Sequence, residues 1–156
     1  MKQVLAFFMV LLVLASCTSR QQQASEPVSP FRQYVDSITK AHPNYSGNIA
    51  VQKMIGEDFN KHLTPFPGIL EGVSFSVVNM GETAGKTMVM FSSYDPPVYL
   101  WCEDYGTENA AKLDTKKSYK IAGGTFDRYE PVEGVANAYL QLGSVFVKDL
   151  AMEEEK

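Results

Sequence analysis

The first part of the chain places apolar residues at helical spacing. Ser29-Pro30 is typical of a helix start, because serine caps the first turn and proline is tolerated there. Pro43 marks the end of this helix. The apolar positions recur at intervals of three and four along one face, and they are Phe31, Tyr34, Val35 and Ile38.

A second helix is expected from about Asn48 to Leu63. Gly56 lies within it and weakens it by about 1 kcal/mol relative to alanine. The segment 64–68, with two prolines and a glycine, marks a firm boundary. The pattern therefore predicts a helical pair over residues 31–64, and the apolar positions of the second helix are Val51, Met54, Ile55, Phe59 and Leu63.

From Ile69 onward the apolar positions follow a period of two, which predicts strands. The expected strands cover residues 73–78, 87–92, 98–103, 119–126 and 138–150, the last bent near Gly143. A helical turn is expected at 108–113, a polar loop at 127–137 and a solvated acidic tail at 153–156. Residues 31–156 thus read as a single domain, with strands over 69–151.

Three strands, a short helix and two strands follow the element order of the oligonucleotide/oligosaccharide-binding (OB) barrel. The segment from Leu113 to Gly123 resembles the entry to the fourth strand of such barrels. From about Asn48 the chain also resembles small barrel-bearing lipoproteins of Bacteroidetes-type bacteria, some grouped as tRNA-anti-like. The expected fold is therefore α+β: two N-terminal helices plus a five-stranded antiparallel OB-like barrel, with a short helix between strands 3 and 4. The resemblance implies no common activity.

The N-terminus has the pattern of a secretory signal over residues 1–16. Lys2 is followed by an unbroken apolar run from Val4 to Leu14, which is 11 residues long. A helix of that length spans roughly 16 Å, whereas a bilayer core is about 30 Å thick. The run is therefore too short for a membrane span and fits a signal peptide.

The sequence Leu14-Ala15-Ser16-Cys17 resembles the lipobox of bacterial lipoproteins. Cleavage before Cys17 leaves a cysteine that carries acyl chains such as palmitate, and two or three chains give stable anchoring to membrane lipid. The alternative is an ordinary secretory signal with a chance cysteine after the cut. Residues 17–30 form a polar, flexible tether. In enterobacterial lipoproteins an aspartate after the lipidated cysteine favours the inner membrane, so by that resemblance Thr18 implies the outer membrane, with the domain facing the periplasm or the cell surface.

Charge and composition exclude several classes of function. The chain has 14 Lys+Arg and 18 Asp+Glu. Loss of Lys2 with the signal leaves 13 − 18 = −5, which disfavours nucleic acid as a partner. Lipidation of Cys17 leaves only Cys102, so no internal disulfide is expected. With two histidines, His42 and His62, neither a metal site nor a catalytic triad is expected, and we expect no cofactor and no enzymatic activity.

The third strand carries the candidate binding residues. Alternation places Val98, Leu100 and Cys102 on one face, expected to be the barrel interior. The opposite face carries Tyr99, Trp101 and Glu103, and Tyr105 with the 127–137 loop is expected to form a rim. The open alternative is that the N-terminal helices cover these aromatic residues and make them part of the core.

Two functions follow from this arrangement. The first is a membrane-anchored, non-enzymatic binding module for an envelope glycan, a small molecule or a peptide, because barrels of this kind bind ligands across the second and third strands. The second is a structural or accessory subunit that docks another envelope protein. A concave aromatic floor favours the first, and a flat exposed apolar patch favours the second.

Overall fold

The computed structural model describes residues 28–131 and 140–156. The predicted signal peptide, Cys17 and the tether up to residue 27 lie outside these ranges, as do residues 132–137 of the predicted loop and 138–139 of the predicted fifth strand. Within the described ranges the chain is α+β. It forms helices α2, α3 and α4, a 3-10 turn and strands β1 to β5.

The two N-terminal helices begin at the predicted caps. α2 covers Pro30–Ala41, and the Ser29 hydroxyl accepts a hydrogen bond from the Arg32 backbone N–H. α3 covers Ile49–Lys61, and the Asn48 side chain accepts one from the Val51 N–H. Of the helices in the described residues, none is both long and apolar enough to cross a bilayer.

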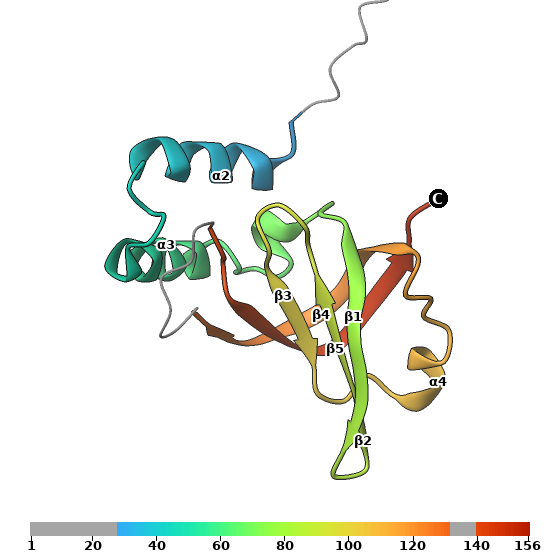
Figure 1. Cartoon of the computed structure of the whole chain (residues 1–156). Coiled ribbons are helices and arrows are strands. Elements are labelled where there is room, and N and C mark those ends of the chain that lie inside the picture. The colour runs from blue at the N-terminus through green and yellow to red at the C-terminus, as the bar shows by residue number, and fades with distance from the viewer. Residues whose placement is uncertain (1–27, 132–139) are drawn as a thin grey trace, which may run out of the picture.

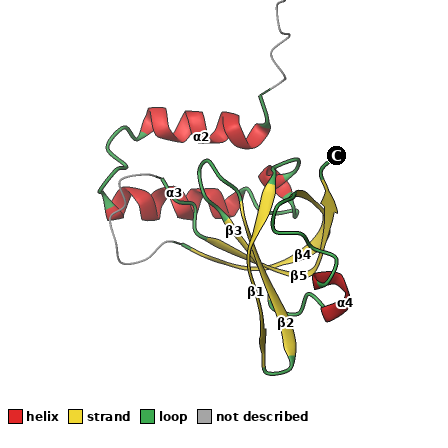
Figure 2. Ribbon diagram, turned by 45° about the vertical axis from the view of Figure 1, so that its right-hand side comes forward, coloured by secondary structure: helices red, strands yellow, loops and turns green. Residues whose placement is uncertain are grey.

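Five strands close into a ring in the order β1-β2-β3-β5-β4 and back to β1 (Figures 1 and 2). Their bounds are Phe75–Thr83, Lys86–Ser92, Tyr99–Cys102, Ser118–Glu130 and Ser144–Glu154, with the 3-10 turn at Gly68–Leu70 and α4 at Thr107–Ala110. The helix α4 thus stands between the third and fourth strands, as expected.

The sheet is mixed, so the expectation of an entirely antiparallel barrel was wrong. β3 pairs parallel to β5, with Tyr99 opposite Ser144 and Trp101 opposite Phe146. The other four junctions are antiparallel. The physical reason is a matter of parity: strands that alternate in direction around a closed ring must be even in number, and five strands leave one junction parallel.

The last two strands extend further toward the C-terminus than the sequence predicts, and β5 begins at Ser144, later than predicted. β4 runs to Glu130, into the expected polar loop, and β5 runs to Glu154, into the expected acidic tail. Ion pairs hold the end of the chain: Lys117 Nζ lies 2.8 Å from Glu154 Oε2, and Lys120 Nζ lies 2.8 Å from Glu155 Oε1. Polar residues can extend a strand when partners on a neighbouring strand or loop satisfy their charges.

The helical pair covers one end of the ring, and the tip of the β1–β2 hairpin lies at the other end (Figures 1 and 2). Phe59 of α3 is fully buried, and its ring packs edge-on to Tyr129 of β4 with centroids 5.8 Å apart. A Cβ atom built on Gly56 would lie 2.7 Å from the Tyr129 hydroxyl oxygen. Glycine at this position therefore lets α3 approach β4 closely.

Candidate functional site

The two faces of β3 separate as the alternation predicts. Val98, Leu100 and Cys102 are buried in the ring, with exposed fractions of 0%, 0% and 1%. On the outer face, Tyr99 and Trp101 are half-buried and Glu103 is exposed. The helices therefore leave part of the Trp101 surface open.

Trp101 belongs to a row of side chains that crosses the outer face of four strands. Met90 of β2 is paired with Trp101, Trp101 with Phe146 of β5, and Phe146 with Arg128 of β4. The rings of Trp101 and Phe146 are nearly parallel, at 12°, with centroids 6.0 Å apart. The Arg128 guanidinium carbon lies 3.6 Å above the centre of the Phe146 ring, which is a favourable cation–π geometry.

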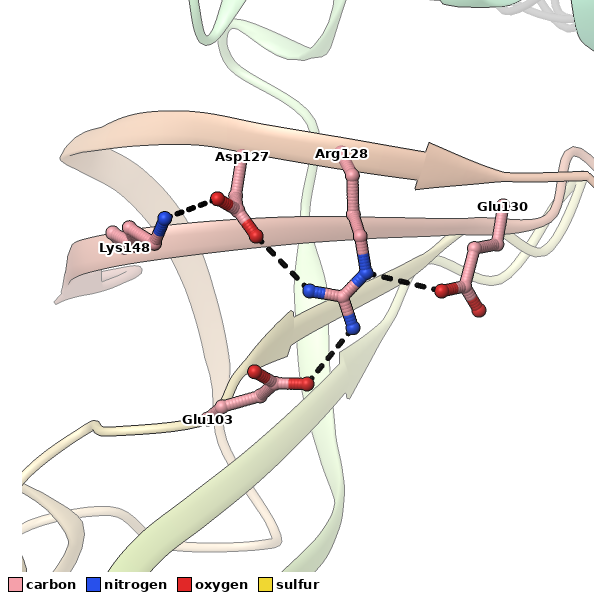
Figure 3. Close-up of polar contacts among 5 residues, drawn as sticks. All are labelled: Glu103, Asp127, Arg128, Glu130 and Lys148. Carbon is pink, nitrogen blue, oxygen red and sulfur yellow. Dashed lines mark hydrogen bonds and ion pairs between the residues drawn. The ribbon is translucent and has the colours of Figure 1, made fainter.

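Arg128 is held by three carboxylates (Figure 3). Its Nη2 donates to Glu103 Oε1 at 2.8 Å, Nη1 to Asp127 Oδ2 at 3.0 Å, and Nε to Glu130 Oε1 at 3.1 Å. These hydrogen bonds raise the pKa of Arg128. With one donor engaged on each nitrogen, the guanidinium is fixed over Phe146 and orients that ring.

Asp127 links Arg128 to Lys148 of β5, because its second oxygen accepts a hydrogen bond from the Lys148 ammonium (Figure 3). This bond, followed by those from Arg128, lowers the pKa of Asp127. The group of five side chains carries two cations and three carboxylates, so its net charge is −1. The net charge of the group therefore disfavours an anionic ligand at Arg128.

A hollow of about 290 Å³ lies beside this row. We call it the β3–β5 hollow, and Trp101, Glu103, Asp127, Arg128, Phe146 and Lys148 are among the residues that line it. Three cationic and four carboxylate side chains line it in all. One of the carboxylates, Asp149, adopts a left-handed backbone with φ 52°, which is uncommon for a residue other than glycine.

A second hollow of about 640 Å³ lies between α2 and the loop from β2 to β3. We call it the α2 hollow, and Arg32, Val35, Tyr45, Tyr94, Asp95 and Tyr99 are among its lining residues. An ion pair between Arg32 Nη1 and Asp95 Oδ2, at 3.0 Å, ties the helix to the loop. Tyr94 is 96% exposed.

Tyr105 does not form a rim, contrary to expectation. It is 7% exposed, and its ring packs against Phe91 in the core with centroids 5.8 Å apart. The chain turns inward after β3, where the Tyr105 N–H donates to the Thr87 carbonyl at 2.8 Å. Burial raises the pKa of the Tyr105 phenol. Tyr105 is therefore a core residue.

The loop predicted over residues 127–137 is wrong as far as Glu130, which is part of β4, and residues 132–137 lie outside the described ranges. Asp127, Arg128 and Glu130 do lie beside Glu103, but they belong to β4 rather than to a loop. Sequence reasoning missed Phe146, which stacks beside Trp101, and Arg128, which lies over the Phe146 ring. Alternation between Val145 and Val147 points to Phe146 as an outward residue, whereas no local pattern identifies Arg128.

The described residues contain no group of three or more histidine, cysteine and acidic side chains placed to hold a metal ion. His62 lies at the end of α3, with Nε2 3.8 Å from Asp58 Oδ2, and Asp58 also accepts a hydrogen bond from the Tyr34 hydroxyl. Neither histidine of the chain is among the residues that line the two hollows.

The sequence matches no protein-family model, and no significant similarity was found to a curated protein or to a solved structure. Functional arguments for this chain therefore depend on its own residues.

Proposed function

We propose that the protein is a bacterial lipoprotein, anchored through acylated Cys17 to the outer membrane, whose domain binds a neutral glycan of the cell envelope without enzymatic activity. The lipobox after an 11-residue apolar run supports the anchoring. The ring of five strands, with α4 between the third and fourth, supports an OB-like barrel.

The observation that carries the binding proposal is the partly open Trp101 beside Phe146 on the outer strand face. Flat aromatic rings bury the apolar faces of sugars, and carboxylate oxygens such as those of Glu103 accept hydrogen bonds from sugar hydroxyls. Arg128 holds Phe146 in place, so little side-chain freedom is lost when a ligand binds.

The same surface disfavours two other ligand classes. Carboxylates outnumber cations in the β3–β5 hollow by four to three, which opposes nucleic acid and other polyanions. Peptides that add a strand need a free sheet edge, but β3 pairs with β2 and β5 on both sides from Tyr99 to Trp101. A small molecule with sugar-like hydroxyls would use the same contacts as a glycan.

Trp101 is the only tryptophan of the chain, so its fluorescence reports on this face directly. The experiment is to titrate the full lipidated protein in detergent with neutral oligosaccharides released from its native envelope. We expect a shift of the emission, and calorimetry should show that Trp101→Ala and Phe146→Ala lose the binding. Met54→Ala, which removes an exposed apolar side chain on α3, is the control and should bind normally.

An emission that no oligosaccharide fraction changes, together with no heat of binding, would refute the glycan proposal. A shift produced only by envelope peptides would assign the site to a peptide instead.

The second candidate, an accessory subunit that docks another envelope protein, draws on a different surface. Among the described residues, β1 beyond Ser76 pairs with β2 only, since its pairing with β4 stops at Phe75 and Ser76. Val78 and Met80 on this part of β1 are 49% and 41% exposed. If docking is the function, the double variant Val78→Ser/Met80→Ser should lose an envelope partner that the wild type retains, and Trp101→Ala should keep it.

A further inference from the structure

Residues of β3 line both hollows. Tyr99 lines the α2 hollow, and Trp101, two residues further along the same strand face, lines the β3–β5 hollow. Residues two apart on a strand point the same way and lie about 7 Å apart. Tyr99 and Trp101 therefore lie about 7 Å apart on one face of β3, each lining one of the two hollows.

Further aromatic side chains lie near Trp101 and line the hollow beside Tyr99. Phe146 lies beside Trp101 at one end. At the other end, Tyr94 and Tyr45 both line the α2 hollow, and the side chain of Tyr94 is almost wholly in solvent. We call Tyr94, Tyr99, Trp101 and Phe146 the aromatic track. The strand register places polar Ser92 and Ser144 on either side of Tyr99, so hydroxyl groups flank this track.

The two hollows have the same sign of charge. One cationic and two carboxylate side chains line the α2 hollow, and three cationic and four carboxylate side chains line the β3–β5 hollow. Together they carry 4 − 6 = −2, because the lining sets share no charged residue. A negatively charged polymer would be repelled along the whole track, and a neutral one would not.

We infer that the ligand is a linear neutral glycan long enough to occupy both hollows at once, with separate sugar units on Trp101 and on Tyr99 and Tyr94. This inference rests on the proposed function, and it adds that recognition depends on chain length. A single sugar can fill the β3–β5 hollow alone, whereas the larger α2 hollow is filled only when the chain continues past Tyr99. Units bound in the two hollows are joined, so the second contact forms with little further loss of freedom.

The test compares oligomers of one to six units in three neutral series: β-linked N-acetylglucosamine, β-linked glucose and α-linked glucose. Binding is followed by Trp101 fluorescence with the full lipidated protein. In a series that binds, affinity should rise steeply with length and then level off. Tyr99→Ala and Tyr94→Ala should weaken the longest oligomers roughly tenfold, as expected for one lost stacking contact, and leave the shortest binding oligomer nearly unchanged.

Tyr94→Ala keeps the test independent of folding, because Tyr94 is 96% exposed. Met54→Ala is the control and should not alter the dependence on length. Affinity that does not change with length, or an equal loss for short and long oligomers in both tyrosine variants, overturns this inference and leaves the proposed function standing. Failure of all three series and of the native envelope oligosaccharides to bind refutes the proposed function and this inference together.

Discussion

At the scale of single residues, alternation predicts which side of β3 faces the core but not what surrounds the outer side. Tyr99, Trp101 and Glu103 share a face because a strand has a period of two. Arg128 lies 25 positions from Glu103 in sequence, and it reaches Glu103 only because β5 lies between β3 and β4. No local pattern in the sequence shows which strands are neighbours, so the contact between Arg128 and Glu103 could not be predicted.

Replacing Arg128 tests its role in orienting the aromatic row. Arg128→Ala leaves Glu103, Asp127 and Glu130 close together without the cation they share. We expect a loss of stability on the order of 1 kcal/mol, since the group is partly exposed and water screens it. Raising the salt from 0.1 M to 1 M should shrink this loss, because the Debye length falls from about 10 Å to about 3 Å.

Urea unfolding at the two salt concentrations measures the effect. Arg128→Lys keeps the charge but not the planar fork, so it should restore part of the stability and not the environment of Trp101. A salt-independent loss in Arg128→Ala would show that packing on Phe146, and not charge, is what Arg128 contributes.

Asp127 makes part of the stability dependent on pH. Its folded-state pKa lies below the ordinary value, chiefly because of the hydrogen bond from Lys148. The stabilisation is therefore fully present above the ordinary carboxyl pKa of about 4, and is lost as the pH falls through the lower folded value. Between pH 6 and pH 3 the wild type should lose more stability than Asp127→Asn, as measured by urea unfolding at both values. Equal losses would show that the ion pair is not formed in solution.

Cys102 should be inert, because its side chain is buried in the ring and 1% of the residue is exposed. A thiol reagent should label the folded domain far more slowly than the unfolded chain. Cys102→Ala should cost on the order of 1 kcal/mol, typical of a small truncation in a core. Rapid labelling under native conditions would contradict the burial.

At the scale of elements, the two helices and the five strands could be predicted from periodicity, with caps at Ser29 and Asn48 in the expected places. The ends of β4 and β5 could not. Asp127–Glu130 and the terminal glutamates look like solvated polar segments in sequence. They form strands because ion pairs satisfy their charges: Lys148 of β5 pairs with Asp127 of β4, and Lys117, just before β4, pairs with Glu154 of β5. Such partners are visible only once the register is known.

Gly56 shows how packing can override helix propensity. By propensity alone, Gly56→Ala should stabilise α3 by about 1 kcal/mol. A new Cβ would lie 2.7 Å from the Tyr129 hydroxyl oxygen, and overpacking typically costs 1–3 kcal/mol. We therefore expect a net loss of stability in thermal or urea unfolding, whereas Glu57→Ala, an exposed neighbour on the same helix, should have little effect.

A second substitution tests whether the close approach to the Tyr129 hydroxyl causes the loss of stability in Gly56→Ala. Tyr129→Phe removes the oxygen that the new methyl group would meet, although it also removes the 2.6 Å hydrogen bond to the Leu142 carbonyl. The losses from Gly56→Ala and Tyr129→Phe should therefore add up to more than the loss in the double variant. Strict additivity would show that the clash is relieved in another way.

At the scale of the whole molecule, the N-terminal pattern predicts the compartment, and the strand ring cannot do so. If Cys17 is the acylated mature N-terminus, mass spectrometry of the native protein should find diacylglycerol and a further acyl chain on it. Cys17→Ala should leave an unprocessed precursor or a soluble product instead of a membrane-bound one. A free Cys17 thiol in the native protein, or cleavage at another position, would contradict the anchoring.

The parallel junction between β3 and β5 also bears on how the protein is made. Ser144–Glu154 is the last of the described strands in chain order, and it joins β3 to β4 in the closed ring. Until it emerges, Leu100 and Phe91 have no complete core to enter. Because β5 closes the ring, a precursor in which β5 has not yet been synthesised cannot reach its closed form. If the precursor is exported by a signal peptide, as proposed, this late closure favours passage through a translocation pore before folding.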